Sequence, residues 1–134
     1  MLLDLSGCLT YRKPIFLKLE NVQPCGSFKL RGALNATRKI PIKTLELDVY
    51  TASTGNFAQS LTWITNNMDM RWTVLVPSRS PMIQLLSIKE LGVMITKVGL
   101  YEWWESIKTH SYERMQGTFV HAVCEPDVVA GLKI

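Results

Sequence analysis

The sequence has few cysteines, few charged residues and no long apolar run. The three cysteines are an odd number and lie far apart, which excludes a disulfide framework and predicts a reducing compartment, the cytoplasm. No apolar stretch approaches the ~18 residues that span a bilayer, so we expect no membrane partner. Charged residues make up 19% and apolar residues 47%, a composition typical of a packed domain and not of a disordered chain.

The net charge of +4 is unevenly distributed along the chain. Residues 1–43 hold eight basic and two acidic residues, whereas residues 44–134 hold seven basic and nine acidic ones. A basic arm of this kind occurs in nucleic-acid-binding proteins, and it also occurs as part of a larger surface with an acidic partner segment. Because the basic residues stand singly or in pairs with little aromatic interleaving, we expect no nucleic-acid partner.

Four short β-rich runs indicate the fold class. They start 23, 21 and 25 residues apart: Val49–Ala52, Trp72–Val76, Val93–Val98 and Thr118–Val123. This spacing is typical of βα units with right-handed crossovers, and apolar runs of this kind belong to strands covered on both faces. Residues 48–123 are therefore predicted to form an α/β unit, a four-stranded parallel sheet with helices on both faces. In the last crossover segment, Trp104, Ile107 and Met115 are predicted to lie near one face, the one that packs on the sheet.

A lysine near a predicted helix start is the first candidate for chemistry. The turn Gln23–Gly26 precedes Ser27, which is a suitable N-cap, and Pro41 ends the helix. Lys29 then lies in the first turn, where the positive end of the helix and the neighbouring Phe28 disfavour an ammonium ion. The neutral amine is the form that Schiff-base chemistry requires. The alternative is an ordinary solvated lysine.

A polar loop after the first strand of the sheet is the second candidate. Ser53, Thr54, Gly55 and Asn56 enter the next helix. Hydroxyls and free backbone N–H groups at a helix N-terminus bind anions, and ligands of parallel sheets lie at the carboxyl ends of strands. Taken alone, the loop is equally well explained as a helix N-cap.

Together, the two segments resemble a known family. The run from Leu17 to Asn35, with Ser27-Phe28-Lys29-Leu30-Arg31-Gly32-Ala33 at its centre, is similar to the cofactor-lysine region of threonine/serine dehydratases and serine racemases. These are pyridoxal-phosphate enzymes with a tryptophan-synthase-β-like fold. The Ser53–Asn56 loop resembles the family's Ser-x-Gly-Asn loop. Three further segments fall in family order: Val76-Pro77, Glu90–Val93 and Glu125–Gly131.

The resemblance implies roles for individual residues. Lys29 would bind pyridoxal 5'-phosphate as an internal aldimine and then take the Cα proton of the substrate. Phe28 would flank the cofactor ring, and Asn56 would hydrogen-bond its phenolic oxygen. The substrate carboxylate would be bound by Ser53, Thr54, Gly55 and Asn56. The implied activity is an ammonia-lyase that converts a small amino acid, L-threonine or L-serine, to a 2-keto acid and ammonia.

Three positions depart from the family pattern. Cys25 stands in place of the usual threonine, and Phe57 replaces the usual histidine. Thr54 occupies a position where racemases tend to have serine and dehydratases alanine, so a serine racemase-like isomerase stays open as an alternative. The two histidines and Cys124 are too few and too scattered to predict a metal site.

Members of that family run considerably further than residue 134, through a glycine-rich loop that holds the cofactor phosphate. We therefore expect residues 1–47 to be an N-terminal piece of the large cofactor domain, residues 48–123 the small α/β domain, and residues 124–134 a truncated return to the large domain. The alternative is a catalytically inactive fragment, either an interaction partner or the product of an incomplete gene prediction. For a full-length member the resemblance implies a homodimer or higher oligomer.

Overall fold

A four-stranded parallel sheet organises the protein in the computed structural model, which describes residues 2–4, 16–44, 47–68, 70–89 and 92–133. The strands are β3 (Asp48–Ala52), β4 (Thr73–Pro77), β5 (Met94–Val98) and β6 (Gly117–Phe119), in the order β5-β4-β3-β6. Tyr50 of β3 is level with Thr73 on one side and Phe119 on the other. The predicted parallel sheet is confirmed, although its last strand is shorter than the apolar run from Thr118 to Val123.

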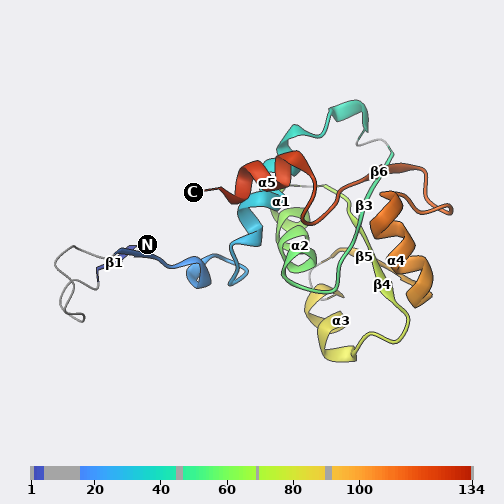
Figure 1. Cartoon of the computed structure of the whole chain (residues 1–134), viewed down its shortest axis with the longest axis horizontal. Coiled ribbons are helices and arrows are strands. Elements are labelled where there is room, and N and C mark those ends of the chain that lie inside the picture. Colours follow the sequence, from blue (N-terminus) through green and yellow to red (C-terminus); the bar gives the residue numbers. More distant parts are fainter. Residues whose placement is uncertain (1, 5–15, 45–46, 69, 90–91, 134) are drawn as a thin grey trace.

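Helices cover both faces of this sheet (Figure 1). On one face lie α2 (Asn56–Met68) and α3 (Met82–Lys89), and on the other lies α4 (Leu100–Thr109). Alternation along β4 sends Val74 and Val76 toward α2 and α3 and Leu75 toward α4, as the period of a strand requires. The chain places β4 and β5 on one side of β3 and then crosses to place β6 on the other side, so the strand order reverses between β3 and β6. Doubly wound sheets bind ligands at such a position.

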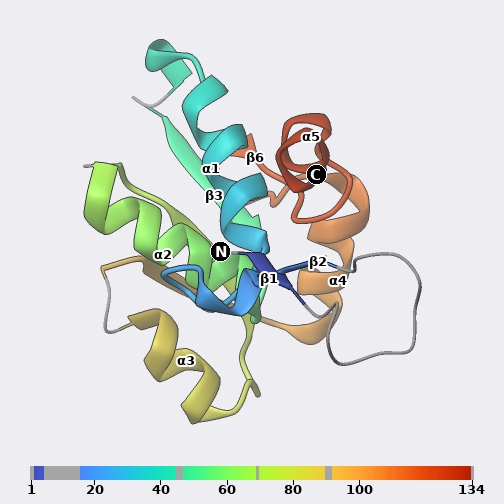
Figure 2. The ribbon, with the colours of Figure 1, turned by 90° about the vertical axis from the view of Figure 1, so that its left-hand side faces the viewer.

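Two further helices pack beside α2. The helices α1 (Lys29–Lys39) and α5 (Pro126–Leu132) lie side by side in both views, and their buried residues share one core with α2 (Figures 1 and 2). Gly32 and Gly131 face each other at the crossing: a Cβ on Gly131 would lie 2.9 Å from the Cα of Gly32 and 2.6 Å from the carbonyl oxygen of Arg31. The two backbones can approach this closely because neither position carries a side chain.

The side chain of Arg31 joins the same two helices. Its guanidinium donates to the carbonyl oxygens of Gly131, Leu132 and Lys133 at 2.9 to 3.2 Å. These are acceptors that the C-terminal turn of α5 cannot use within the helix, so Arg31 satisfies them. Its Nε lies 3.1 Å from the carboxylate of Glu20, in the 3-10 turn Glu20–Val22 that precedes α1.

The N-terminal part forms a small separate ribbon. The strands β1 (Leu2–Asp4) and β2 (Phe16–Lys18) pair antiparallel and extend away from the sheet and its helices in Figure 1. A second 3-10 turn, Ile42–Thr44, leads from α1 toward β3. None of the helices in the described ranges is long and apolar enough to cross a membrane.

Two local predictions were wrong by one residue. The helix α1 begins at Lys29 with Phe28, not Ser27, as its N-cap, because the chain already has helical backbone angles at Phe28. In α4 it is Trp103 that packs against the sheet, and its indole N–H donates to the carbonyl of Leu75 at 2.9 Å. Trp104 is 51% exposed, since it lies about 100° further around the helix.

Candidate active site

The turn before α1 sets the position of Lys29. Gly26 has a φ of 64°, and its N–H donates to the carbonyl of Gln23 at 2.7 Å, which closes the predicted turn. Ser27 is buried, and its hydroxyl accepts a hydrogen bond from the backbone N–H of Lys29 at 3.2 Å. Ser27 therefore still satisfies one of the free N–H groups at the helix start, from one position outside the N-cap.

The amine of Lys29 points to the loop that follows β6. Its Nζ donates to the carbonyl oxygen of Ala122 at 3.3 Å, across 93 positions in the sequence. The Phe28 ring lies beside it, with the ring centroid 5.4 Å from Nζ, and 44% of this phenylalanine is exposed. Lys29 itself is half-buried. A half-buried amine and a partly exposed aromatic ring thus lie side by side at the start of α1.

Strand pairing brings this amine to the carboxyl edge of the sheet. Beyond the end of β6 the ladder continues, because the N–H of Val120 donates to the carbonyl of Tyr50 at 2.8 Å. The buried hydroxyl of Thr51 then donates to the carbonyl of Val120 at 2.7 Å. The segment from Val120 to Ala122 thus runs beside the end of β3, from which the loop Ser53–Asn56 emerges. Lys29 and this loop consequently belong to the same edge, at the point where the strand order reverses.

The Ser53–Asn56 loop is open in front of α2. Ser53 and Thr54 are half-buried, whereas Gly55 and Asn56 are exposed. A Cβ built on Gly55 would have no atom within 4 Å outside its chain neighbours, so this backbone faces free space. The N–H of Gly55 has a long contact of 3.4 Å with the hydroxyl of Ser53. A helix start with accessible N–H groups and hydroxyls can bind a carboxylate.

A buried hydroxyl and the thiol of a half-buried cysteine connect this loop to the turn before Lys29. The hydroxyl of Ser60, which is fully buried in α2, donates to the carbonyl of Asn56 at 2.7 Å. The thiol of Cys25 lies 3.5 Å from the same hydroxyl. Cys25, one of the three departures from the family pattern, therefore links the two predicted segments through Ser60.

His121 also lies in this region, although the sequence did not indicate it as a candidate site residue. It is 93% buried (7% exposed), and its Nδ1 accepts backbone hydrogen bonds from Val123 at 3.1 Å and Cys124 at 2.9 Å. Burial, and secondarily the neighbouring His110 with its ring 4.8 Å away, lowers the pKa of His121 below its usual 6.5. A histidine after a strand is a weak sequence signal, since the role depends on a turn that only the fold reveals.

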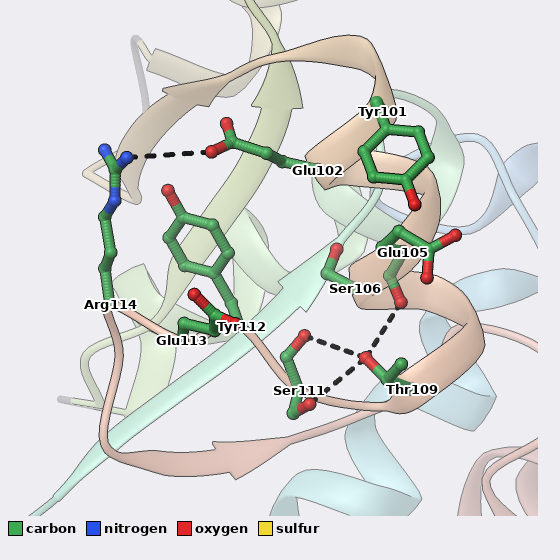
Figure 3. A pocket seen from close by; sticks show the side chains of 9 residues that line it. All are labelled: Tyr101, Glu102, Glu105, Ser106, Thr109, Ser111, Tyr112, Glu113 and Arg114. Carbon is green, nitrogen blue, oxygen red and sulfur yellow. Dashed lines mark hydrogen bonds and ion pairs between the residues drawn. The ribbon is translucent and has the colours of Figure 1, made fainter.

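A hollow of about 430 Å³ lies elsewhere, between α4 and the segment that follows it (Figure 3). Its polar side chains are largely engaged with one another or with backbone. Glu102 accepts from the N–H of Gly99 at 2.9 Å, and Glu105 pairs with Lys108 at 2.9 Å. Arg114 approaches Glu102 at 3.7 Å. These contacts stabilise the ends of α4 and supply no nucleophile.

The sequence matches the family described as pyridoxal-phosphate dependent enzyme over residues 2–134, and the chain belongs to that family. Its relatives include threonine dehydratases and serine racemases. The biosynthetic L-threonine dehydratase of Burkholderia multivorans is 34% identical over 126 residues, which are 90% of this chain and 24% of that protein. The L-threonine ammonia-lyase of Geobacter sulfurreducens is 32% identical over 119 residues, 88% of this chain and 30% of that protein.

Among solved structures, the serine racemase of Dictyostelium discoideum superposes with a TM-score of 0.75 and 32% identity, over 89% of this chain and 39% of that one. The chain thus spans less than half the length of these relatives. The cofactor of the family is pyridoxal phosphate.

The described residues fit part of this cofactor. Lys29 offers an amine to its aldehyde carbon, and the exposed face of Phe28 suits its ring. The eight glycines of the sequence lie at least six positions apart, so this sequence contains no glycine-rich cluster of the kind that cradles a phosphate. The fit is therefore to the reactive end and the ring of the cofactor.

Proposed function

We propose that this chain carries the catalytic lysine and the substrate-carboxylate loop of a pyridoxal-phosphate-dependent ammonia-lyase acting on L-threonine or L-serine. The observation that supports this most is the position of the Lys29 amine. It reaches the Ala122 carbonyl at the carboxyl edge of the sheet, where the Ser53–Asn56 loop also lies. The family membership and the threonine dehydratases among the relatives point the same way.

Each residue would have a distinct task. The bound cofactor supplies an electron sink for the negative charge that develops at the substrate Cα. Lys29 would hold the cofactor through Nζ and, once released, take the Cα proton at that atom. Phe28 would flank the ring, and Asn56 would donate to the phenolic oxygen. Backbone N–H groups and hydroxyls of Ser53–Gly55 would bind the substrate carboxylate.

Racemisation is the second candidate, because a serine racemase is among the similar structures. A racemase needs a proton-transfer group on each face of Cα, and Thr54 is the residue in this loop that would supply the second one. Its side chain is β-branched and half-buried, so its hydroxyl has little freedom to turn toward a substrate. Elimination needs only Lys29, and we therefore favour the lyase.

The proposal includes the organisation of a longer protein. Residues 1–47 would belong to the large cofactor domain, residues 48–123 would be the small domain, and residues 124–134 would return to the large one. Consistent with this, α1 and α5, from the two outer parts, pack against each other. A homo-oligomer in the cytoplasm, with a small amino acid as substrate, completes the proposal. An inactive fragment is the competing outcome.

Reduction with borohydride in the presence of pyridoxal phosphate tests the role of Lys29. We expect peptide mass spectrometry to find the label on Lys29 in the wild type and to find it lost in Lys29→Ala. Lys39, which is exposed and paired with Asp127, serves as the control lysine. Equal labelling of the two lysines would refute the proposal.

A second assay decides the reaction type. The protein, supplied with cofactor and L-serine, should release more pyruvate and ammonia than D-serine, as measured by chiral chromatography. An excess of D-serine would favour the racemase. Specific labelling of Lys29 without any turnover would identify an inactive fragment.

A further inference from the structure

The chain reverses directly after His121 through a turn built on that side chain. Nδ1 accepts from the N–H groups two and three positions further on, those of Val123 and Cys124, at 3.1 and 2.9 Å. Asparagine and aspartate side chains commonly organise turns in this way. Here a buried imidazole does so.

The hydrogen bonds fix the chemical state of the imidazole. A backbone N–H can only donate, so Nδ1 must carry a free electron pair and the ring must be neutral with its proton on Nε2. Titratable and charged groups at the described turn include His110, with its ring 4.8 Å away, Cys124 within the turn, Glu125 directly after it, and Lys29 at the Ala122 carbonyl. Burial, and secondarily the neighbouring His110, lowers the pKa of His121, in line with a neutral imidazole.

The carbonyl that Lys29 contacts lies inside this turn. Ala122 is the residue between the histidine and the first N–H that it accepts, and its oxygen is 3.3 Å from Nζ of Lys29. The direction of a carbonyl in a tight turn follows from the turn geometry. If the two bonds to Nδ1 break, this carbonyl is free to rotate away from the amine.

We propose that His121 is a positioning residue for Lys29: its imidazole holds the 122–124 turn so that the Ala122 carbonyl faces the lysine amine. The inference rests on the proposed role of Lys29 for its functional meaning. The contacts themselves are independent of cofactor and substrate. His121 touches neither the reacting atoms nor the proposed substrate loop in any described contact, so it acts through Ala122.

Two substitutions by side chains of similar size distinguish the effect of losing the hydrogen-bond acceptor from the effect of losing the imidazole ring. His121→Asn and His121→Leu both remove the imidazole, but only asparagine keeps an oxygen able to accept the two N–H bonds. Backbone amide exchange at Val123 and Cys124 reports on the turn. Competitive acetylation of the full chain by acetic anhydride reports on how accessible the Lys29 amine is. The measured quantity is the acetylation rate of Lys29 relative to that of Lys39. The Lys29 amine must leave the Ala122 carbonyl before it can attack the reagent.

We expect His121→Leu to accelerate both amide exchange and the relative acetylation of Lys29, the latter about five-fold, as for loss of one hydrogen bond of ordinary strength. His121→Asn should stay near the wild type in both. Unchanged acetylation in His121→Leu, or equal behaviour of the two variants, would overturn the inference. If both variants unfold, nitrogen NMR of the wild-type imidazole decides: a proton on Nδ1 refutes the proposal and a bare Nδ1 supports it.

These outcomes are distinct from those of the proposed function. Failure of pyridoxal phosphate to label Lys29 in the wild type would refute the role of the lysine while leaving the acetylation results interpretable. Specific labelling of Lys29 together with unchanged acetylation in His121→Leu would keep the function and refute the role of His121.

Discussion

A single methyl group at Gly131 should loosen the helix that carries Lys29. The Cβ of Gly131→Ala would lie 2.6 Å from the carbonyl oxygen of Arg31 and 2.9 Å from the Cα of Gly32, both of which are backbone atoms of α1. A flexible side chain could move aside, but these atoms move only if α1 and α5 separate. Separation would also weaken the bonds from Arg31 to the last carbonyls of α5.

The magnitude follows from two opposing effects. Overpacking in a close-packed contact costs about 1 to 3 kcal/mol. Alanine in place of glycine within a helix returns about 0.5 to 1 kcal/mol. We therefore expect Gly131→Ala to lower the free energy of unfolding by roughly 1 kcal/mol, the difference between the midpoints of these two ranges. Propensity alone would predict the opposite sign, which makes this substitution a sharp test of the packing.

Urea denaturation measures the effect, as a lower midpoint with an unchanged dependence on denaturant. Ala130→Gly is the matched control, because Ala130 is exposed in the same helix and its substitution changes helix propensity at a surface position. It should cost no more than about 1 kcal/mol. If Gly131→Ala were as stable as the wild type or more stable, the close approach of α1 and α5 would be refuted.

Three other substitutions or conditions test separate contacts. Burial lowers the pKa of His121, so below pH 6.5 the unfolded chain binds a proton at this histidine more readily than the folded chain does. The free energy of unfolding should therefore fall as the pH drops below 6.5. Urea denaturation at several pH values should show a smaller fall in His121→Asn. Trp103→Phe loses the hydrogen bond to the Leu75 carbonyl and should lower the free energy of unfolding by about 1 to 3 kcal/mol, measured by thermal unfolding. Trp104→Phe, at an exposed position, should change it by no more than about 0.5 kcal/mol. Equal effects would contradict the orientation of α4. Arg31→Lys keeps the charge but loses the planar fork, and we expect a loss of about 1 kcal/mol by urea denaturation.

The parallel sheet was predictable because its signals are local. Apolar runs about 20 residues apart define strands and crossovers regardless of what packs on them. The same applies to the turn before Lys29, in which Gly26 adopts a positive φ. The place of the Ser53–Asn56 loop at a carboxyl strand end also follows from the order of the elements. The predictions that depend only on neighbouring residues or on the order of the elements therefore agree with the structure.

Features that depend on the phase of an element or on distant pairing were not predictable. The inward tryptophan of α4 is Trp103 because the helix begins at Leu100, where Glu102 accepts from the N–H of Gly99, and a shift of one residue turns a side chain by about 100°. The contact from Lys29 to Ala122 spans 93 positions. The hydrogen bonds to His121 come from backbone N–H groups, and because every residue except proline has one, no sequence pattern indicates these bonds.

The order of contacts along the C-terminal part explains how one segment fixes the lysine helix. Ala122 meets the side chain of Lys29, the carbonyl of Asp127 accepts from Asn35 at 2.7 Å, and the carbonyls of 131–133 meet Arg31. The three donors are side chains of α1, and the five acceptors are all main-chain carbonyls. The segment 122–133 therefore holds α1 mainly through its main-chain carbonyls, supported by the pair between Lys39 and the Asp127 carboxylate and by the buried side chain of Val128. The turn at His121 and the close approach at Gly131 determine where these carbonyls lie.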